Sequence, residues 1–226
     1  MLHAGHDDAR VWHEKIGILP VLHDLYQKNK LPAVIVITPA SNDHRGLSPL
    51  FDPDYYDGPN GKVGTLIGRE LPRVIRERYQ TLKGPQFWAI GWLSSGGWGA
   101  LNSGLRHLDQ FNIFFSQIGY FSDSSGRKNS PQDFIGDIPP LQRKKLRIYM
   151  DAGLNELTGP RMPTSTRKFH ATLDQLGMAN VMYTFPGGHG LSGADYGWNY
   201  DQKHAFDALF YVGENLKAAL ESKAVK

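Results

Sequence analysis

The chain has 226 residues, of which 40% are hydrophobic and 21% charged, and its formal net charge is +3. That length suits one domain with a sizeable core, and the composition excludes a chain that is disordered throughout. The absence of cysteine excludes disulfides, thiolate metal sites and a cysteine nucleophile. No stretch approaches the length of a membrane-spanning helix, and so small a charge is weak evidence for nucleic acid. We therefore expect neither a membrane span nor a nucleic-acid partner.

The first eight residues hold several potential metal ligands but no targeting signal. They show neither a basic start nor an apolar core, so no signal peptide is visible and the compartment stays open: cytoplasmic as the chain stands, secreted if residues precede it. His3, His6, Asp7 and Asp8 lie close together, but their spacing matches no zinc motif. We expect no metal there.

Short runs of β-branched and aromatic residues alternate with segments that carry apolar residues at helical spacing. This alternation predicts an α/β fold, in which a mostly parallel sheet is covered by helices on both faces. The predicted strands are residues 33–38, 87–93, 111–115, 146–150 and 181–185, and the predicted helices are residues 65–79, 98–108, 163–176 and 205–220.

Two long segments interrupt this alternation, residues 40–63 and 122–140, and both are rich in Asp, Gly, Pro and Ser. Loops of this length in a compact domain usually shape a site. The first contains Asp52, Asp54 and Asp57, which resemble a calcium loop only faintly, because Asp57 stands where an EF-hand needs glycine. We expect no calcium site.

Ser94 follows the second predicted strand and stands two residues before Gly96. A serine on a sharp strand-to-helix turn, followed by glycine, is typical of a nucleophile elbow, although a serine there can also simply cap a helix. Glu156 follows the fourth strand and His189 follows the fifth. A serine nucleophile needs a histidine base, and that base needs a carboxylate to orient it. Asp151, nearer the strand end, is the alternative acid.

Five segments together resemble one esterase family of the α/β-hydrolases, which includes feruloyl esterases, enterochelin esterases, S-formylglutathione hydrolase and mycolyltransferases. They are spread over nearly the whole chain. The segments are Leu2-His3-Ala4-Gly5, Arg69-Glu70-Leu71-Pro72, Ser94-Ser95-Gly96-Gly97-Trp98-Gly99-Ala100-Leu101, Gly153-Leu154-Asn155-Glu156 and Pro186-Gly187-Gly188-His189.

The resemblance implies a single α/β-hydrolase domain over residues 1–226 that needs no cofactor. It implies a serine carboxylic-ester hydrolase, in which Ser94 is the nucleophile, His189 the base and Glu156 the orienting acid. The oxyanion hole would be formed by backbone N–H groups of Ser95 and of the loop at Ala4 and Gly5. The substrate would be a small-molecule or polysaccharide-linked ester. Three aromatic side chains are expected either to line its pocket or to belong to the core: Trp98, Tyr120 and Trp198.

Two departures from the family pattern matter. Trp92 stands where the family has glycine, two residues before the nucleophile, and its bulk is expected to crowd the elbow. The oxyanion-loop motif begins at residue 2, so we expect the sheet to lack its N-terminal strands and the sequence to be truncated at its start. The same residues leave two alternatives open: an acyltransferase using the same triad, and a non-catalytic binding protein on a decayed hydrolase fold. The oligomeric state stays undetermined.

Overall fold

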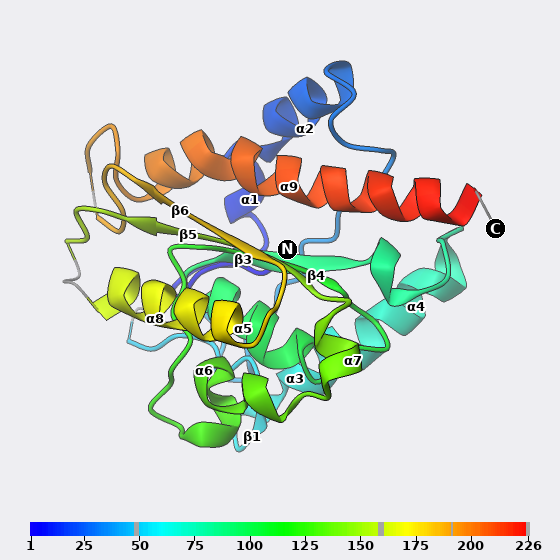
Figure 1. The fold of residues 1–226 in the computed structure, drawn as a ribbon. Helices are drawn as coiled ribbons and strands as arrows, with labels where there is room; N and C mark the ends of the chain where they lie inside the picture. The colour runs from blue at the N-terminus through cyan, green and yellow to red at the C-terminus, as the bar shows by residue number, and fades with distance from the viewer. Residues whose placement is uncertain (48–49, 158–160, 191, 225–226) are drawn as a thin grey trace.

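The computed structural model describes residues 1–226 apart from 48–49, 158–160, 191 and 225–226. Its centre is a four-stranded sheet with the strand order β3-β4-β5-β6, and every neighbouring pair is parallel (Figure 1). The strands are β3 (Ala89–Leu93), β4 (Ile113–Gln117), β5 (Arg147–Gly153) and β6 (Asn180–Phe185). They confirm four of the five predicted strands to within a few residues.

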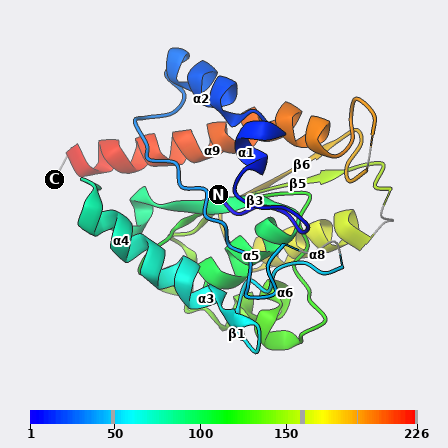
Figure 2. The same ribbon diagram turned by 180° about the vertical axis from the view of Figure 1, so that it is seen from behind.

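Helices cover both faces of this sheet, as the alternating pattern predicts. α1 (Val11–Glu14), α2 (Ile18–Gln27) and α9 (Trp198–Ala224) lie on one face. α4 (Leu71–Arg78), α5 (Ser95–Gly104) and α8 (Arg161–Gln175) lie on the other, which the reverse view also shows (Figure 2). This arrangement confirms the predicted α/β fold, in which helices cover both faces of a parallel sheet. No helix among the described residues is long and apolar enough to cross a membrane.

The remaining elements are short and surround the larger helices. A two-residue hairpin, β1 (Asp57–Gly58) and β2 (Gly61–Lys62), leads into α3 (Val63–Thr65), and a π-helical turn (Leu66–Glu70) joins α3 to α4. Together these cover the predicted helix 65–79. The other short elements are α6 (Pro131–Phe134), α7 (Pro140–Arg143) and three 3-10 turns, Pro85–Phe87, Arg127–Asn129 and Ile135–Asp137.

The prediction of a strand at residues 33–38 is wrong, because this described segment has no strand assignment. Met1 and Leu2 lie between it and β3: the Met1 amine donates a hydrogen bond to the Ile37 carbonyl at 2.7 Å, and the Leu2 amide donates to the Gly91 carbonyl at 2.8 Å. Leu2 forms one isolated parallel bridge with Trp92. These contacts are too few to form a β-ladder. Residues 33–38 therefore have the composition of a β-strand but no neighbouring strand with which to form hydrogen bonds.

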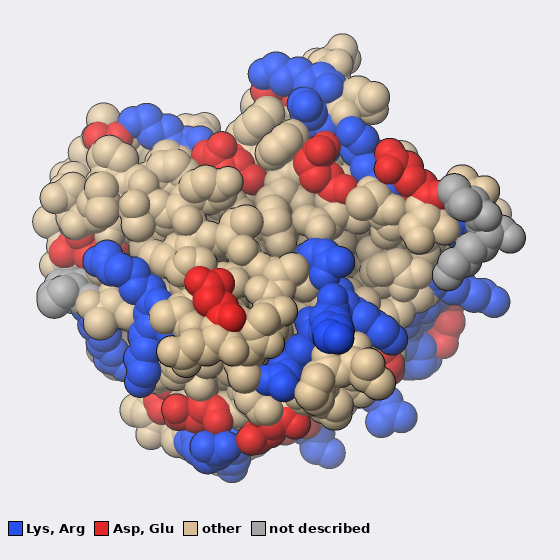
Figure 3. Space-filling view, viewed as in Figure 1, with Lys and Arg blue, Asp and Glu red and all other residues tan. Residues whose placement is uncertain are grey.

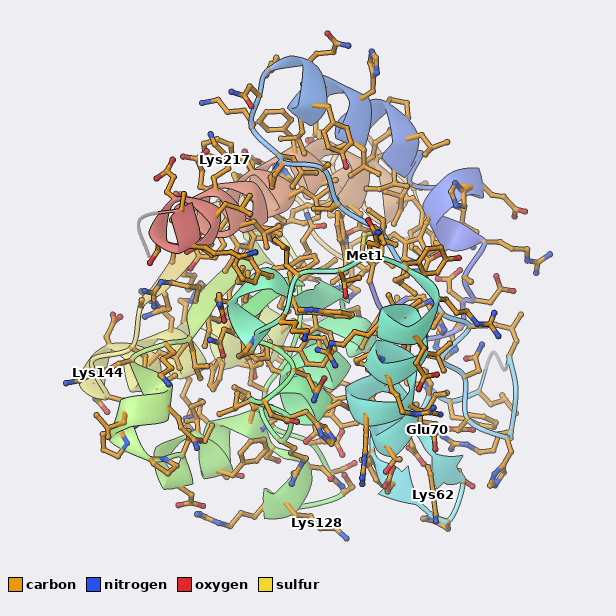
Figure 4. All side chains as sticks on the ribbon, turned by 90° about the vertical axis from the view of Figure 1, so that its right-hand side faces the viewer. Met1, Lys62, Glu70, Lys128, Lys144 and Lys217 are labelled. Atoms are coloured by element: carbon orange, nitrogen blue, oxygen red, sulfur yellow. The ribbon has the colours of Figure 1, made fainter. Side chains whose placement is uncertain are left out.

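An apolar cavity of about 450 Å³ lies along the same edge of the sheet. Its walls come from residues 31–37, from β3 and from the helices α4 and α9, and Met1 lines it. Figure 4 shows Met1 well inside the outline of the molecule, whereas Lys62, Lys128, Lys144 and Lys217 lie at its periphery. Burial lowers the pKa of the Met1 amine to about 5. The lining includes Leu2 but none of the residues that directly follow the strands, so the cavity is distinct from the site formed at the strand ends.

Candidate active site

Ser94 occupies a sharp turn between β3 and α5. Its backbone angles are φ 51° and ψ −118°, a conformation that residues with a side chain rarely adopt. Its amide donates to the Gln117 carbonyl, and its own carbonyl accepts from the Trp98 amide in the first turn of α5. Because strain of this kind persists only where the surroundings enforce it, the turn is consistent with a functional serine.

The glycines after Ser94 let α5 approach its neighbours closely. A Cβ on Gly96 would overlap the backbone carbonyls of Leu2 and His3, and a Cβ on Gly97 would overlap the Ser116 side chain of β4. The N-terminal segment therefore runs directly against the first turn of α5. The structure begins this helix at Ser95, whereas the sequence predicts a start at Trp98. The difference arises because glycine has a poor helix propensity, so Gly96 and Gly97 do not look helical in the sequence.

His189 and Glu156 meet Ser94 in one hydrogen-bonded chain. The His189 Nε2 atom lies 2.8 Å from Ser94 Oγ, and His189 Nδ1 lies 2.8 Å from Glu156 Oε2. The same carboxylate oxygen accepts the His189 backbone N–H at 2.9 Å. The Glu156 side chain is 1% exposed and that of His189 is 20% exposed. The carboxylate is thus shielded from water while the imidazole stays accessible.

The loops that carry these two residues are joined by backbone hydrogen bonds and by close packing of glycines. The Asn155 amide donates to the Gly187 carbonyl at 3.0 Å. Gly188 has φ +140°, and a Cβ at this position would lie 2.5 Å from the Glu156 Oε1 atom. Glycine at this position therefore leaves room for the carboxylate that contacts His189.

Asp151, the alternative acid, lies elsewhere. It belongs to β5 and is fully buried, and its carboxylate accepts hydrogen bonds from the hydroxyl of Tyr200 at 2.9 Å and that of Tyr149 at 3.2 Å. Burial raises the pKa of Asp151 to about 7, although these hydrogen bonds oppose the shift. Asp201 is also buried, and burial raises its pKa well above the ordinary value, with the charge of Asp151 contributing. The carboxylate in contact with His189 is that of Glu156.

Trp92 fits without distorting the elbow. Its ring is fully buried and packs edge-on against Trp12 at 5.2 Å and Phe115 at 5.3 Å. It belongs to the hydrophobic cluster beneath α1, α2 and α9. The expected crowding is absent because Trp12, from the N-terminal part of the chain, provides a partner for the large ring.

The segment Leu2 to Gly5, which supplies two of the expected oxyanion donors, is fixed next to the elbow. Tyr55 donates its hydroxyl hydrogen to the His3 carbonyl at 2.7 Å, and the His3 Nδ1 atom lies 2.8 Å from the Ala4 carbonyl oxygen. Because Leu2 and His3 also contact Gly96, Ala4 and Gly5 follow directly on residues that pack against the turn after Ser94. Roles for Ala4, Gly5 and the Ser95 amide in an oxyanion hole stay predictions.

Asp52 contributes a second carboxylate to this region, which the sequence considered only for calcium. The Ser95 hydroxyl donates to Asp52 Oδ2 at 2.5 Å, and a Cβ on Gly5 would overlap Asp52 Oδ1. The contact joins positions 43 residues apart, so no local spacing indicates it. In the sequence, Asp52 is marked only by its position in the long segment 40–63, and a loop of that length is expected to shape a site.

The aromatic residues expected either to line a pocket or to belong to the core are largely buried. Trp98 is 2% exposed, donates its ring N–H to the Asn129 carbonyl and stacks on Tyr120 at 5.5 Å. Trp198, at the start of α9, is half-buried beneath the ammonium group of Lys15. Their role in substrate binding stays a prediction.

The residues considered as metal ligands mostly have partners within the protein. Asp7 pairs with Lys15 and Asp8 with Arg10, while Asp57 accepts hydrogen bonds from Thr65. Within the part of the chain that the structure describes, no group of three His, Cys, Asp or Glu side chains is arranged to hold a metal ion.

Across the face in Figure 3, basic and acidic side chains are interspersed.

Several solved esterases have the same fold as this chain. The chain matches a ferulic acid esterase with a TM-score of 0.80 and 21% identity, over 95% of this chain and 83% of that one. It matches the S-formylglutathione hydrolase of Staphylococcus aureus with a TM-score of 0.66 and 12% identity, covering 93% and 81% of the two chains. The enterobactin esterase of Shigella flexneri gives a TM-score of 0.64 and 17% identity, and the match covers 94% of this chain and about half, 52%, of that one.

No protein-family model matches the chain, and no curated protein matches it in sequence. At these levels of identity the solved structures show a shared fold. They include feruloyl and enterobactin esterases and an S-formylglutathione hydrolase, three of the groups that the sequence motifs resemble.

Proposed function

We propose that this protein is a serine carboxylic-ester hydrolase that works through an acyl-enzyme on Ser94. The observation that carries the proposal is the continuous hydrogen-bonded chain from the Ser94 hydroxyl through His189 to Glu156, with both side-chain distances at 2.8 Å. These are the contacts that a nucleophile needs with its base, and that the base needs with its orienting carboxylate. The resemblance of the fold to solved esterases supports the same reaction class.

In the first half of the reaction, Ser94 Oγ attacks the carbonyl carbon of the ester while His189 Nε2 takes the hydroxyl proton. The tetrahedral intermediate then collapses, the bond to the alcohol oxygen breaks, and His189 returns the proton to the leaving alcohol. Glu156 accepts a hydrogen bond from Nδ1–H, which leaves Nε2 free to accept a proton and stabilises the imidazolium that forms. The acyl group is then bonded to Ser94.

In the second half, water replaces the alcohol. His189 removes a proton from the water as it attacks the acyl carbon, and the proton then passes to Ser94 Oγ as the acid departs. Backbone N–H groups of Ser95, Ala4 and Gly5 would stabilise the oxyanion in both halves, and removal of one such donor typically costs about 3–4 kcal/mol in the barrier. The packing of Leu2 and His3 against Gly96 at the start of α5 supports this assignment.

An acyltransferase would use the same residues, with an alcohol in place of water, and no observation in the structure favours it. The reading as a decayed, non-catalytic hydrolase rests on Trp92 and on the incomplete sheet. The buried position of Trp92 and the assembled contacts around Ser94 favour a working site instead.

The test is covalent labelling of the protein with a fluorophosphonate, followed by mass spectrometry and by assays on a panel of p-nitrophenyl esters. A fluorophosphonate reacts with a serine that is activated by its base and oxyanion donors. We expect one adduct, on Ser94, and esterase activity that falls by at least about a thousandfold in Ser94→Ala. Ser124→Ala, at an exposed serine, should label normally. Absence of an adduct on Ser94 in the folded protein would rule the proposal out.

A further inference from the structure

The carboxylate of Asp52 lies between the two segments that the proposed mechanism uses to hold the oxyanion. One of its oxygens accepts the Ser95 hydroxyl at 2.5 Å, and the other is packed against Gly5. Ser95 directly follows the proposed nucleophile, so Asp52 brings a negative charge next to the position where the ester carbonyl must bind.

This charge lacks a partner of opposite permanent charge. Among the described residues no Lys or Arg forms an ion pair with the Asp52 carboxylate. His6 lies 3.6 Å from it, and the Arg45 guanidinium donates to the Asp52 backbone carbonyl at 3.0 Å. The side chains of both are well exposed, 41% for Asp52 and 52% for His6. On the same loop, Asp43 and Asp54 are both bound by the guanidinium of Arg45. Asp52 therefore differs from Asp43 and Asp54 in that its carboxylate forms no ion pair with the Arg45 guanidinium.

The surroundings of Asp52 also reflect this charge. Tyr120 is buried close by, and burial together with the negative charge of Asp52 raises the pKa of its hydroxyl. A carboxylate that no Lys or Arg neutralises attracts cations, so a cationic group of a ligand at this position would be favoured.

We propose that Asp52 is a specificity-determining residue that selects esters carrying an ammonium group within a few bonds of the scissile carbonyl. The inference rests on the proposed function. When a neutral ester reacts, the oxyanion forms next to a second negative charge, which raises the barrier. When the substrate carries an ammonium group, that group neutralises Asp52 in the bound state, and the oxyanion then develops without the repulsion.

The experiment compares kcat/KM for matched pairs of esters that differ only in charge. Butyrylcholine is paired with 3,3-dimethylbutyl butyrate, its neutral isostere, to place the cation on the alcohol side. The methyl esters of 4-(trimethylammonio)butyrate and of 5,5-dimethylhexanoate place it on the acyl side. We expect the wild type to prefer the cationic member of at least one pair by roughly tenfold or more, which corresponds to about 1.4 kcal/mol.

In Asp52→Asn this preference should fall to about twofold or less, because the amide keeps an acceptor for the Ser95 hydroxyl but removes the charge. Activity on the neutral ester should rise, because the charge that repels the oxyanion has been removed, and a merely structural role would not produce that rise. Asp24→Asn makes the same charge change on α2, where Asp24 pairs with Lys28, and should keep the wild-type preference.

The outcomes separate this inference from the proposed function. If fluorophosphonate labels Ser94 and neutral esters are hydrolysed, but the preference is absent or is unchanged in Asp52→Asn, the role of Asp52 is refuted and the hydrolase stands. If Ser94 is not labelled and no ester is hydrolysed, the proposed function fails, and the assignment of Asp52 fails with it.

Discussion

Two carboxylates near the end of β5 illustrate how differently this fold treats the same functional group. Glu156 lies in the loop after the strand, where it contacts the backbone N–H and the ring of His189. Asp151 lies within the strand, where it accepts hydrogen bonds from two tyrosine hydroxyls and from the Ile118 amide. Glu156 thus contacts the accessible base His189, whereas Asp151 is fully buried within the protein.

The difference shows that distance from the strand end is a poor guide to which acid acts. Asp151 is nearer the end of the strand, yet its neighbours are groups that do not titrate near neutral pH, together with a second buried acid, Asp201. Burial favours the protonated form of Asp151, whereas Glu156 accepts hydrogen bonds from the backbone N–H and the ring of His189. Three predictions test this contrast, beginning with the largest expected effect.

Replacing Glu156 by Gln should lower kcat by about 10³- to 10⁴-fold, because an amide can hold the imidazole in the wrong tautomer. The hydrogen bond between His189 and position 156 would then no longer leave Nε2 free to accept the serine proton. The measurement is the hydrolysis of a p-nitrophenyl ester with circular dichroism as a check of folding. Glu77→Gln, at an exposed glutamate paired with Arg73, is the matched control and should retain full activity. A Glu156→Gln protein with near-wild-type kcat would show that another group orients His189.

Replacing Gly188 by Ala should lower kcat/KM by about a hundredfold, since an added methyl group would displace the Glu156 carboxylate from His189. Gly126→Ala is the control, because Gly126 also has a positive φ, at +101°, but nothing lies within 4 Å of its added Cβ. Both variants carry backbone strain, so a comparison of their urea unfolding and their activity separates strain from displacement. Equal activity in the two variants would contradict the assigned packing of Glu156.

Much of the sheet and of the site could be predicted because the signals are local. Ser94 stands between a strand-like run and a glycine-rich segment, and a turn of this kind is encoded within a few residues. Glu156 and His189 each follow a strand, and parallel strands bring their carboxyl ends to one edge of a sheet. Topology alone therefore brings the three loops to the same place.

The failures all depend on contacts between distant segments. A strand at residues 33–38 needs a paired neighbour, and composition does not reveal that no strand pairs with it among the described residues. The effect of Trp92 depends on Trp12, which accommodates the ring from another part of the chain. Asp52 reaches Ser95 from a long loop. Periodicity and motif spacing report on residues that are close in sequence, so they cannot predict contacts between distant segments.

The last of the three predictions concerns Asp151 and pH. Burial raises its pKa from the ordinary 3.8 to about 7, so between these values the folded protein holds a proton that the unfolded chain has released. Stability contributed by this group is therefore present below pH 4 and is lost as the pH rises to about 7, by at most about 1.4 kcal/mol per pH unit. Asp151→Asn cannot lose that proton, so its free energy of unfolding, measured in urea between pH 5 and 7.5, should fall less steeply than that of the wild type. Asp137→Asn, at an exposed residue paired with Arg127, should keep the wild-type slope. If Asp151→Asn and the wild type have parallel profiles, then Asp151 is already charged at pH 5, and burial does not keep its carboxyl group protonated.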